Sequence, residues 1–215
     1  LWLCVQLAVG LLVWLALPGP AIPDALGGAP LNLAQAVALA ALPLVALYPL
    51  MKRITWWPQI WLGLVFSWGV LTAGAAINQT LRVEIWLMYA GCVVWTIAYD
   101  TIYALQDKED DALIGVRSSA RRLGAAWRPF VLAAYAVALF FFAAASYVAG
   151  AQIAPAFGLG LIGAFLIWPL VDAVKDKDQN SALIAFRRNE AIGWALVVLT
   201  AAIPTLITLG PLVSP

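Results

Sequence analysis

Hydrophobic residues fill long runs of this chain, and short polar stretches separate the runs. Seven runs approach the roughly 20 residues that a helix needs to cross the hydrocarbon core of a bilayer. They cover residues 1–17, 33–51, 56–77, 85–105, 129–149, 153–171 and 190–209. The pattern predicts an all-α fold, a polytopic bundle with seven transmembrane helices, whose two chain ends lie on opposite sides of the membrane.

The composition excludes a water-soluble domain. Hydrophobic residues make up 64% of the chain and charged residues 11%, whereas soluble domains carry about 25% charged residues. Cys4 and Cys92 lie inside apolar runs, where we interpret them as small buried hydrophobic residues. The chain has no His, so the commonest acid–base group and metal ligand is missing. Its chemistry must rest on carboxylates, Lys, Arg and Tyr.

The charged residues gather on one predicted side of the membrane. That side receives 11 of the 12 Lys and Arg residues and nine of the 11 acidic residues. Because Lys and Arg in short loops stay in the cytoplasm, we expect this side to be cytoplasmic. Its two long polar connections, 106–128 and 172–189, are the segments where we expect function.

An acidic stretch follows the fourth apolar run. If the helix continues, each residue turns by about 100°, so Asp100, Asp107 and Asp111 share one face and Glu109 points to the opposite side. Like charges on one helix face repel, and a carboxylate near membrane depth is costly unless it is paired. Oxygen ligands suit Mg²⁺, which shares its coordination shell with substrate phosphates. The alternative is a solvated acidic turn, which the position of Asp100 inside an apolar run disfavours.

The same residues resemble a known family. Residues Tyr99–Asp111, followed by Ile114–Ser119, resemble the second aspartate-rich motif and downstream loop of the UbiA superfamily of membrane prenyltransferases. Tyr48–Arg53 with Pro58 and Gln59 resembles another family signature, and Phe186–Asn189 resembles the last cytoplasmic loop. The resemblance covers essentially the whole chain and is closest to the 4-hydroxybenzoate polyprenyltransferases.

The resemblance implies a bundle of nine transmembrane helices and a Mg²⁺-dependent reaction. A polyprenyl group would pass from polyprenyl diphosphate to the ring of 4-hydroxybenzoate in ubiquinone biosynthesis. The implied partners are these two substrates and the lipid bilayer, and no nucleic acid is expected. The implied location is the bacterial inner membrane, or the mitochondrial inner membrane in a eukaryote, with the active site facing the cytoplasm.

One part of the family pattern is missing. The first aspartate-rich motif, Asn-Asp-x-x-Asp, does not occur in these 215 residues, which begin with Leu1. We therefore expect residues 1–215 to form a single prenyltransferase domain that lacks the first two helices of the family. An inactive remnant is the other interpretation.

The resemblance also implies roles for individual residues. Asp107 and Asp111 match the Mg²⁺-chelating pair, and Asp100 is a helper. Arg53 resembles a basic residue that holds the carboxylate of the aromatic substrate. Lys52 is a further candidate for substrate binding, although a role as a positive membrane anchor explains it equally well.

Four more residues are candidates for substrate binding. Arg117 and Ser118 are expected to hydrogen-bond diphosphate oxygens, because a guanidinium fits such oxyanions. Tyr99 and Tyr103 are expected to stabilise an allylic cation with their ring faces. Anchoring at the membrane interface explains both tyrosines nearly as well.

Two alternatives for the function stay open. Relatives that prenylate naphthoate, haem or chlorophyll precursors share the acidic motif. A membrane carrier or cation pathway also uses intramembrane acids, but it would place them near the middle of several spans. Here the acids gather at one face, beside basic loops.

Overall fold

The structure is a computed structural model that describes residues 2–22, 31–151, 153–175 and 178–209. The described residues form helices and no strand, with one isolated bridge between Ala21 and Asn32, which confirms the predicted all-α class. The helices are α1 (Trp2–Leu15), α2 (Leu33–Ala40), α3 (Leu42–Leu47), η1 (Tyr48–Leu50), α4 (Met51–Ile54), α5 (Pro58–Phe66), α6 (Trp68–Asn78), α7 (Val83–Gln106), α8 (Lys108–Ile114), α9 (Ser119–Leu123), η2 (Gly124–Ala126), α10 (Trp127–Val148), α11 (Ile153–Asp172) and α12 (Gln179–Leu209).

Helix occupies each of the seven predicted windows, as one element or as several in series. Within the described residues, four helical stretches are long and apolar enough to cross a membrane: 33–54, 58–78, 83–106 and 119–148. Two further apolar stretches, Cys4–Leu15 and Gly158–Asp172, are shorter. The chain is therefore an integral membrane protein, and the remaining three crossings stay a prediction.

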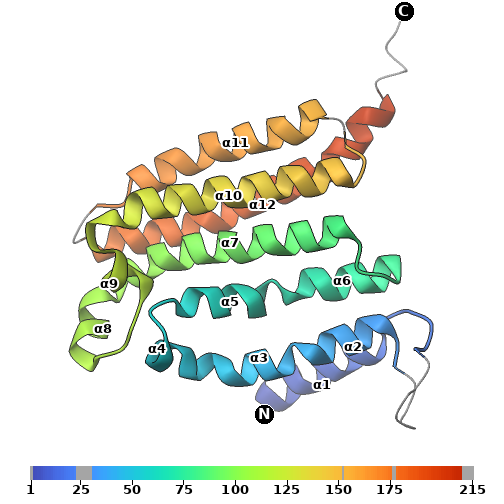
Figure 1. The fold of residues 1–215 in the computed structure, drawn as a ribbon, viewed down its shortest axis with the longest axis horizontal. Helices are drawn as coiled ribbons and strands as arrows, with labels where there is room; N and C mark the ends of the chain where they lie inside the picture. The colour runs from blue at the N-terminus through green and yellow to red at the C-terminus, as the bar shows by residue number, and fades with distance from the viewer. Residues whose placement is uncertain (1, 23–30, 152, 176–177, 210–215) are drawn as a thin grey trace, which may run out of the picture.

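Helix α7 lies at the centre of the bundle (Figure 1). It packs against α10, α5 and α12, and α11 covers α10 and α12. On the other side, α6 packs against α2, which in turn contacts α1. The order of the elements across the bundle therefore runs from α11 to α1. Helix α7 lies between a closely packed half, α10 to α12, and a more loosely packed half, α1 to α6.

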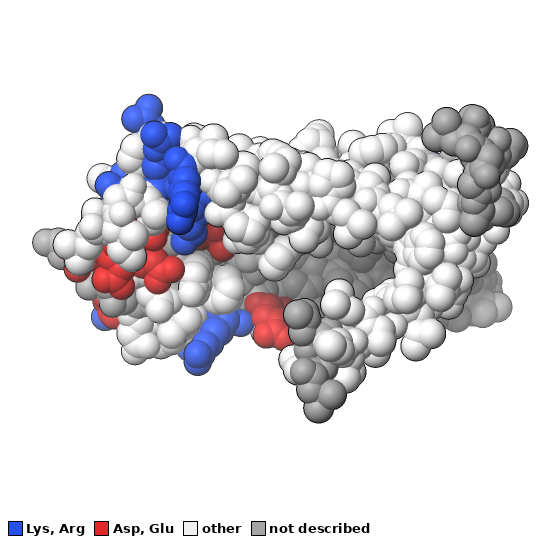
Figure 2. Space-filling model, turned by 90° about the horizontal axis from the view of Figure 1, so that it is seen from below, with Lys and Arg blue, Asp and Glu red and all other residues white. Residues whose placement is uncertain are grey.

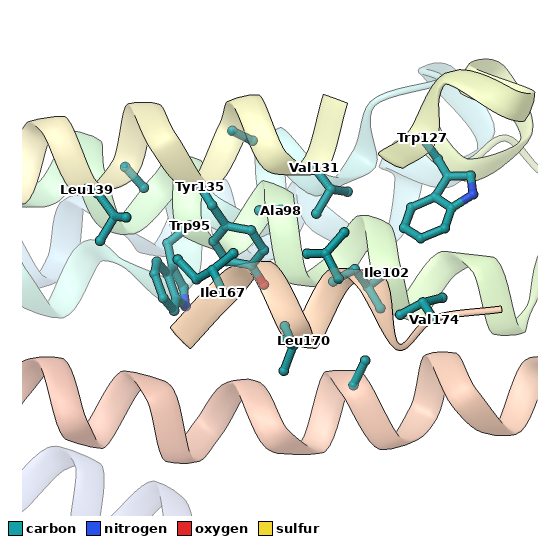
Figure 3. Close-up of a cluster of buried hydrophobic side chains, with 14 of the residues drawn as sticks. Trp95, Ala98, Ile102, Trp127, Val131, Tyr135, Leu139, Ile167, Leu170 and Val174 are labelled. Carbon is teal, nitrogen blue, oxygen red and sulfur yellow. The ribbon is translucent and has the colours of Figure 1, made fainter. Parts of the chain in front are cut away.

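The main hydrophobic core joins α7, α10, α11 and α12 (Figure 3). Trp95 of α7 meets Tyr135 of α10 edge to face, with ring centroids 4.8 Å apart. The Tyr135 hydroxyl donates a 2.9 Å hydrogen bond to Oδ1 of Asn189 in α12. Because a buried polar group is costly without a partner, this bond lets Asn189 remain inside the core.

The stretch from α2 to α4 is broken, in line with the prolines Pro43 and Pro49 that the sequence places in it. Breaks free backbone carbonyls, which have no water to bind inside a bilayer. The Trp68 indole donates a 2.8 Å hydrogen bond to the Val37 carbonyl, and the Trp61 indole donates one of 2.6 Å to the Leu44 carbonyl. Side chains of α5 and α6 thus hold the broken stretch in place.

The charged side chains lie mostly toward one end of the molecule (Figure 2). We call this the charged end: it comprises α4, α8 and α9 and the adjoining ends of α5, α7, α10 and α12 (Figure 1). Near the start of α7, away from this end, Arg82 pairs with Glu84 at 2.6 Å. The segregation agrees with the charge asymmetry of the sequence.

Candidate functional site

The acidic stretch does not continue α7 as one straight helix. The predicted shared face of Asp100, Asp107 and Asp111 depended on such a helix. Helix α7 ends at Gln106, and Asp107 has non-helical torsions (φ −91°, ψ 3°) before α8 begins at Lys108. From this corner α8 turns toward α4 (Figure 1). Gly115 then ends α8 in the left-handed conformation (φ +81°), which glycine adopts without steric cost.

The turn of α8 brings Asp111 to Lys52. The Lys52 ammonium lies 3.8 Å from Oδ1 of Asp111, and the carboxylate side chain is 8% exposed whereas the lysine side chain is 49% exposed. The other carboxylate oxygen, Oδ2, is buried without a hydrogen-bond partner. Since a buried polar atom without a partner is rare in proteins, this oxygen calls for a partner that the described side chains do not supply.

Lys52 also lies within electrostatic range of the other two predicted carboxylates, Asp100 and Asp107. Burial raises the pKa of Asp107 above its ordinary value; the nearby Lys52 ammonium lowers it, and the carboxylates of Asp111 and Asp110 raise it. The structure thus gathers the three predicted acids around one lysine.

These acids do not form a ready metal cluster. Among the residues that the structure describes, no group of three or more His, Cys, Asp or Glu side chains is placed to hold a metal ion. Mg²⁺ commonly takes only one or two carboxylates and completes its shell with water and substrate phosphates. The unpartnered oxygen of Asp111 therefore fits such an ion as one ligand.

The two predicted tyrosines lie on one side of α7. Both contact Phe186 of α12: the ring centroid of Tyr99 is 5.7 Å from that of Phe186, and the centroid of Tyr103 is 4.9 Å away. Arg53, by contrast, is exposed, and within the described part of the chain it makes no ion pair or hydrogen bond through its side chain. Arg53 is free to meet a ligand.

The two predicted diphosphate ligands lie just beyond α8. The Arg117 guanidinium donates a hydrogen bond to the Ile54 carbonyl and lies over the Trp56 ring. Ser118 is fully buried, and its hydroxyl has no hydrogen-bond partner. Arg117 is thus engaged with the protein, and Ser118 is not on a free surface.

The structure adds two residues that the sequence analysis did not single out. Tyr48 lies within electrostatic range of Asp100 and Lys52. Its spacing of four from Lys52 puts both on one helix face, so this signal was available in the sequence. Trp56 contacts two arginines of the acidic connection, and no local pattern reveals such a contact between distant loops.

The opposite face of α8 looks onto a separate cavity of about 930 Å³. Lys108 and Glu109 line it from α8, and Arg121, Trp127 and Lys175 line it from the surrounding elements. The prediction that Glu109 points away from Asp111 therefore agrees with the structure.

Comparison with known proteins gives relatives named 4-hydroxybenzoate octaprenyltransferase or polyprenyltransferase. A 4-hydroxybenzoate octaprenyltransferase of Azotobacter vinelandii is 39% identical over 165 residues, which cover 76% of this chain and 55% of that protein. The mitochondrial 4-hydroxybenzoate polyprenyltransferase of Homo sapiens is 44% identical over 133 residues, covering 61% of this chain and 36% of that protein. The chain spans about half the length of the curated bacterial relatives it matches.

A solved structure shows the same fold. The apo structure of a UbiA homolog from Aeropyrum pernix K1 superposes with a TM-score of 0.60 at 22% sequence identity, covering 82% of this chain and 65% of that one. The family model described as the UbiA prenyltransferase family matches residues 2–189. The resemblance in the aspartate-rich motif thus extends over most of the chain, which belongs to the UbiA prenyltransferase family.

Proposed function

We propose that this chain carries part of the active site of an aromatic prenyltransferase. The reaction is the transfer of a polyprenyl group from polyprenyl diphosphate to the ring of 4-hydroxybenzoate, as the names of the relatives suggest. We place this reaction in ubiquinone biosynthesis and the charged end on the cytoplasmic face. The site would thus lie where a membrane-embedded prenyl chain can meet a soluble aromatic acid.

The observation that carries the proposal is the pairing of Lys52 with a buried Asp111 whose second oxygen has no partner. A structural ion pair would be expected to satisfy both oxygens of a buried carboxylate. Here one oxygen is buried without a partner beside an ammonium that is half exposed. A carboxylate for a cation and an ammonium for an anion are the two groups that a metal diphosphate requires.

We propose that Asp107 and Asp111 hold Mg²⁺ together with the phosphates of the substrate, and that Asp100 supports them from α7. When bound, the ion supplies positive charge that stabilises the departing diphosphate. Lys52 adds a second positive charge on the same leaving group. The carboxylates of the chain orient that charge and keep it at the charged end of the bundle.

The remaining predicted residues act on the organic parts of the substrates. Arg53, exposed and unpaired in the described residues, would bind the carboxylate of 4-hydroxybenzoate through its guanidinium. Tyr99 and Tyr103 would stabilise positive charge on the prenyl group through their rings. The apolar helices exclude water, which would otherwise capture the prenyl cation.

Arg117 and Ser118 were expected to bind the diphosphate directly. Their surroundings support an indirect part, because Arg117 already donates to Ile54 and Ser118 is buried. We propose that they shape the loop after α8 and leave the contact with phosphate oxygens to Lys52 and the bound ion.

The test compares two substitutions within α8 in the natural protein, expressed in membranes. Asp111→Asn should lower prenyl transfer by roughly 100-fold or more, as expected for loss of a group that stabilises the leaving charge. Asp110→Asn removes the same charge from an exposed neighbour and should change turnover by less than about threefold. Equal turnover in the wild type and Asp111→Asn, with both proteins present at the same level, would refute the proposal.

A further inference from the structure

Trp56, in the connection between α4 and α5, lies against two arginines from a distant part of the chain. The Arg117 guanidinium carbon is 5.8 Å from the centroid of the indole, and that of Arg121 is 5.4 Å away. Both distances fall within the range of cation–π contacts. One aromatic ring thus holds two like charges that would otherwise repel each other.

Each arginine also caps the end of a short helix. Arg117 donates from its backbone N–H to the Lys52 carbonyl at 3.0 Å and from its guanidinium to the Ile54 carbonyl, so it caps α4. Arg121 donates to the Asp111 carbonyl at 3.2 Å, which also accepts the backbone N–H groups of Gly115 and Val116, and to the Val116 carbonyl beyond α8, so it adds to the backbone cap of α8. The last carbonyls of a helix carry partial negative charge, which a guanidinium stabilises.

These contacts matter because both helices are short terminal pieces. Helix α4 has four residues and ends the helical stretch 33–54, and α8 has seven residues and follows the corner at Asp107. The ends of helices fray most readily. Lys52 lies on α4 and Asp111 lies on α8. The relative position of the lysine and the carboxylate therefore depends on what holds the two short helices together.

We propose that Trp56 is a positioning residue: its indole holds Arg117 and Arg121 in the places where they cap α4 and α8, and so keeps Lys52 beside Asp111. The cap itself rests on the contacts of the structure alone, and its effect on turnover rests on the proposed function. The competing explanation is that Trp56 is an ordinary interfacial anchor, whose amphipathic ring lies at the headgroup level and whose loss would leave the two arginines in place.

Substitutions at position 56 separate the two explanations. Trp56→Phe keeps an aromatic face for the arginines, while Trp56→Leu keeps an apolar side chain without one. Trp194→Ala is the matched control, since Trp194 is another exposed tryptophan, at 65%. It belongs to α12, away from both arginines in the sequence.

The first measurement is limited trypsin digestion of the detergent-solubilised protein, with cleavage after Arg117, Arg121 and Arg122 followed by mass spectrometry. Cleavage of a locally opened segment follows the population of the open form. Loss of two cation–π contacts should speed cleavage about five- to thirtyfold in Trp56→Leu. Trp56→Phe and Trp194→Ala should stay within about threefold of the wild type. Equal cleavage of Trp56→Leu and the wild type would overturn the proposal.

The second measurement is prenyl transfer by the same variants. Trp56→Leu should raise the Mg²⁺ concentration for half-maximal activity by about fivefold or more and lower kcat, and Trp56→Phe should restore both. We call the contact of Trp56 with Arg117 and Arg121 the indole clamp. If Trp56→Leu loosens the loop but leaves both values unchanged, the proposal that the indole clamp positions Lys52 is wrong. If the wild type transfers no prenyl group, the proposed function fails, and the digestion result still decides whether the indole clamp exists.

Discussion

Two parts of the molecule carry the candidate residues, and they are built differently: α7, which we call the packed wall, and the stretch from α2 to α4, which we call the thin wall. Ten described residues of α7 are buried, and α7 lies against α5, α10 and α12. In the stretch from α2 to α4, only Ala34 and Met51 are buried among the described residues. The wall that carries Asp100 is fixed by packing, whereas the wall that carries Lys52 is fixed by a few polar contacts.

The difference teaches where the site is adjustable. A residue on a packed helix keeps its place because moving it disrupts many close contacts. A residue on the thin wall is held by a few hydrogen bonds, each of which contributes about 1 kcal/mol. Because so few contacts hold it, the loss of one lets it move. We therefore expect substitutions on the thin wall to affect activity and those on the packed wall to affect stability.

The largest expected effect is on activity, at Lys52 and Arg53 in α4. Lys52→Gln should lower kcat/KM for the prenyl diphosphate by about 100-fold, because a positive charge on the leaving group is lost. Arg53→Gln should instead raise the KM for 4-hydroxybenzoate by about tenfold, the usual worth of one charge-assisted hydrogen bond. Steady-state kinetics with each substrate varied in turn measures both. Equal effects of the two variants on both substrates would show that these residues act only as membrane anchors.

The next effect is on stability, in the packed wall. A Cβ on Gly63 of α5 would lie 2.8 Å from the Val93 carbonyl oxygen of α7, so Gly63→Ala must push two backbones apart. We expect a loss of about 1–3 kcal/mol in the free energy of unfolding. Gly69→Ala in α6 is the matched control, since nothing lies within 4 Å of its Cβ position. Thermal unfolding of the solubilised protein should rank Gly63→Ala below both the control and the wild type. Equal melting of the two variants would mean that α5 and α7 are not tightly packed.

The smallest effect concerns the indole bonds that hold the broken stretch. Trp68→Phe removes the donor to the Val37 carbonyl while keeping an aromatic ring, and should cost about 0.5–1.5 kcal/mol. Trp194→Phe, at an exposed position, should cost less than about 0.5 kcal/mol. Hydrogen exchange of α2 and α3 should rise in Trp68→Phe only. Unchanged exchange there would show that the bond does not stabilise the break.

Much of the fold was predictable because membrane helices follow apolar length. The start of α7 at Val83 and the end of α10 at Val148 lie within two residues of the predicted limits, 85 and 149. The break of α5 from α6 at Ser67 was not predicted, because no proline stands there. The local sequence pattern predicts the helices, but it does not predict which helices pack against each other.

The sequence proposed residues for the candidate site but not their arrangement in space. The acidic spacing pointed to Asp100, Asp107 and Asp111, yet the end of α7 at Gln106 removed the single helix face. The contacts of Arg117 with Ile54 and Trp56 could not be predicted from the sequence, for a different reason. Its partners Ile54 and Trp56 lie more than 60 residues away in the chain, and a single sequence carries no sign of such contacts.

The corner at Asp107 has a consequence for electrostatics. A straight continuation of α7 would carry Asp111 roughly 16 Å beyond Asp100 along the axis, too far for one ammonium to serve both. Folding α8 back lets Lys52 face all three acids, so anions outnumber cations within this group. A bare diphosphate approaching it would be repelled, and we expect the donor to enter already accompanied by its divalent counterion.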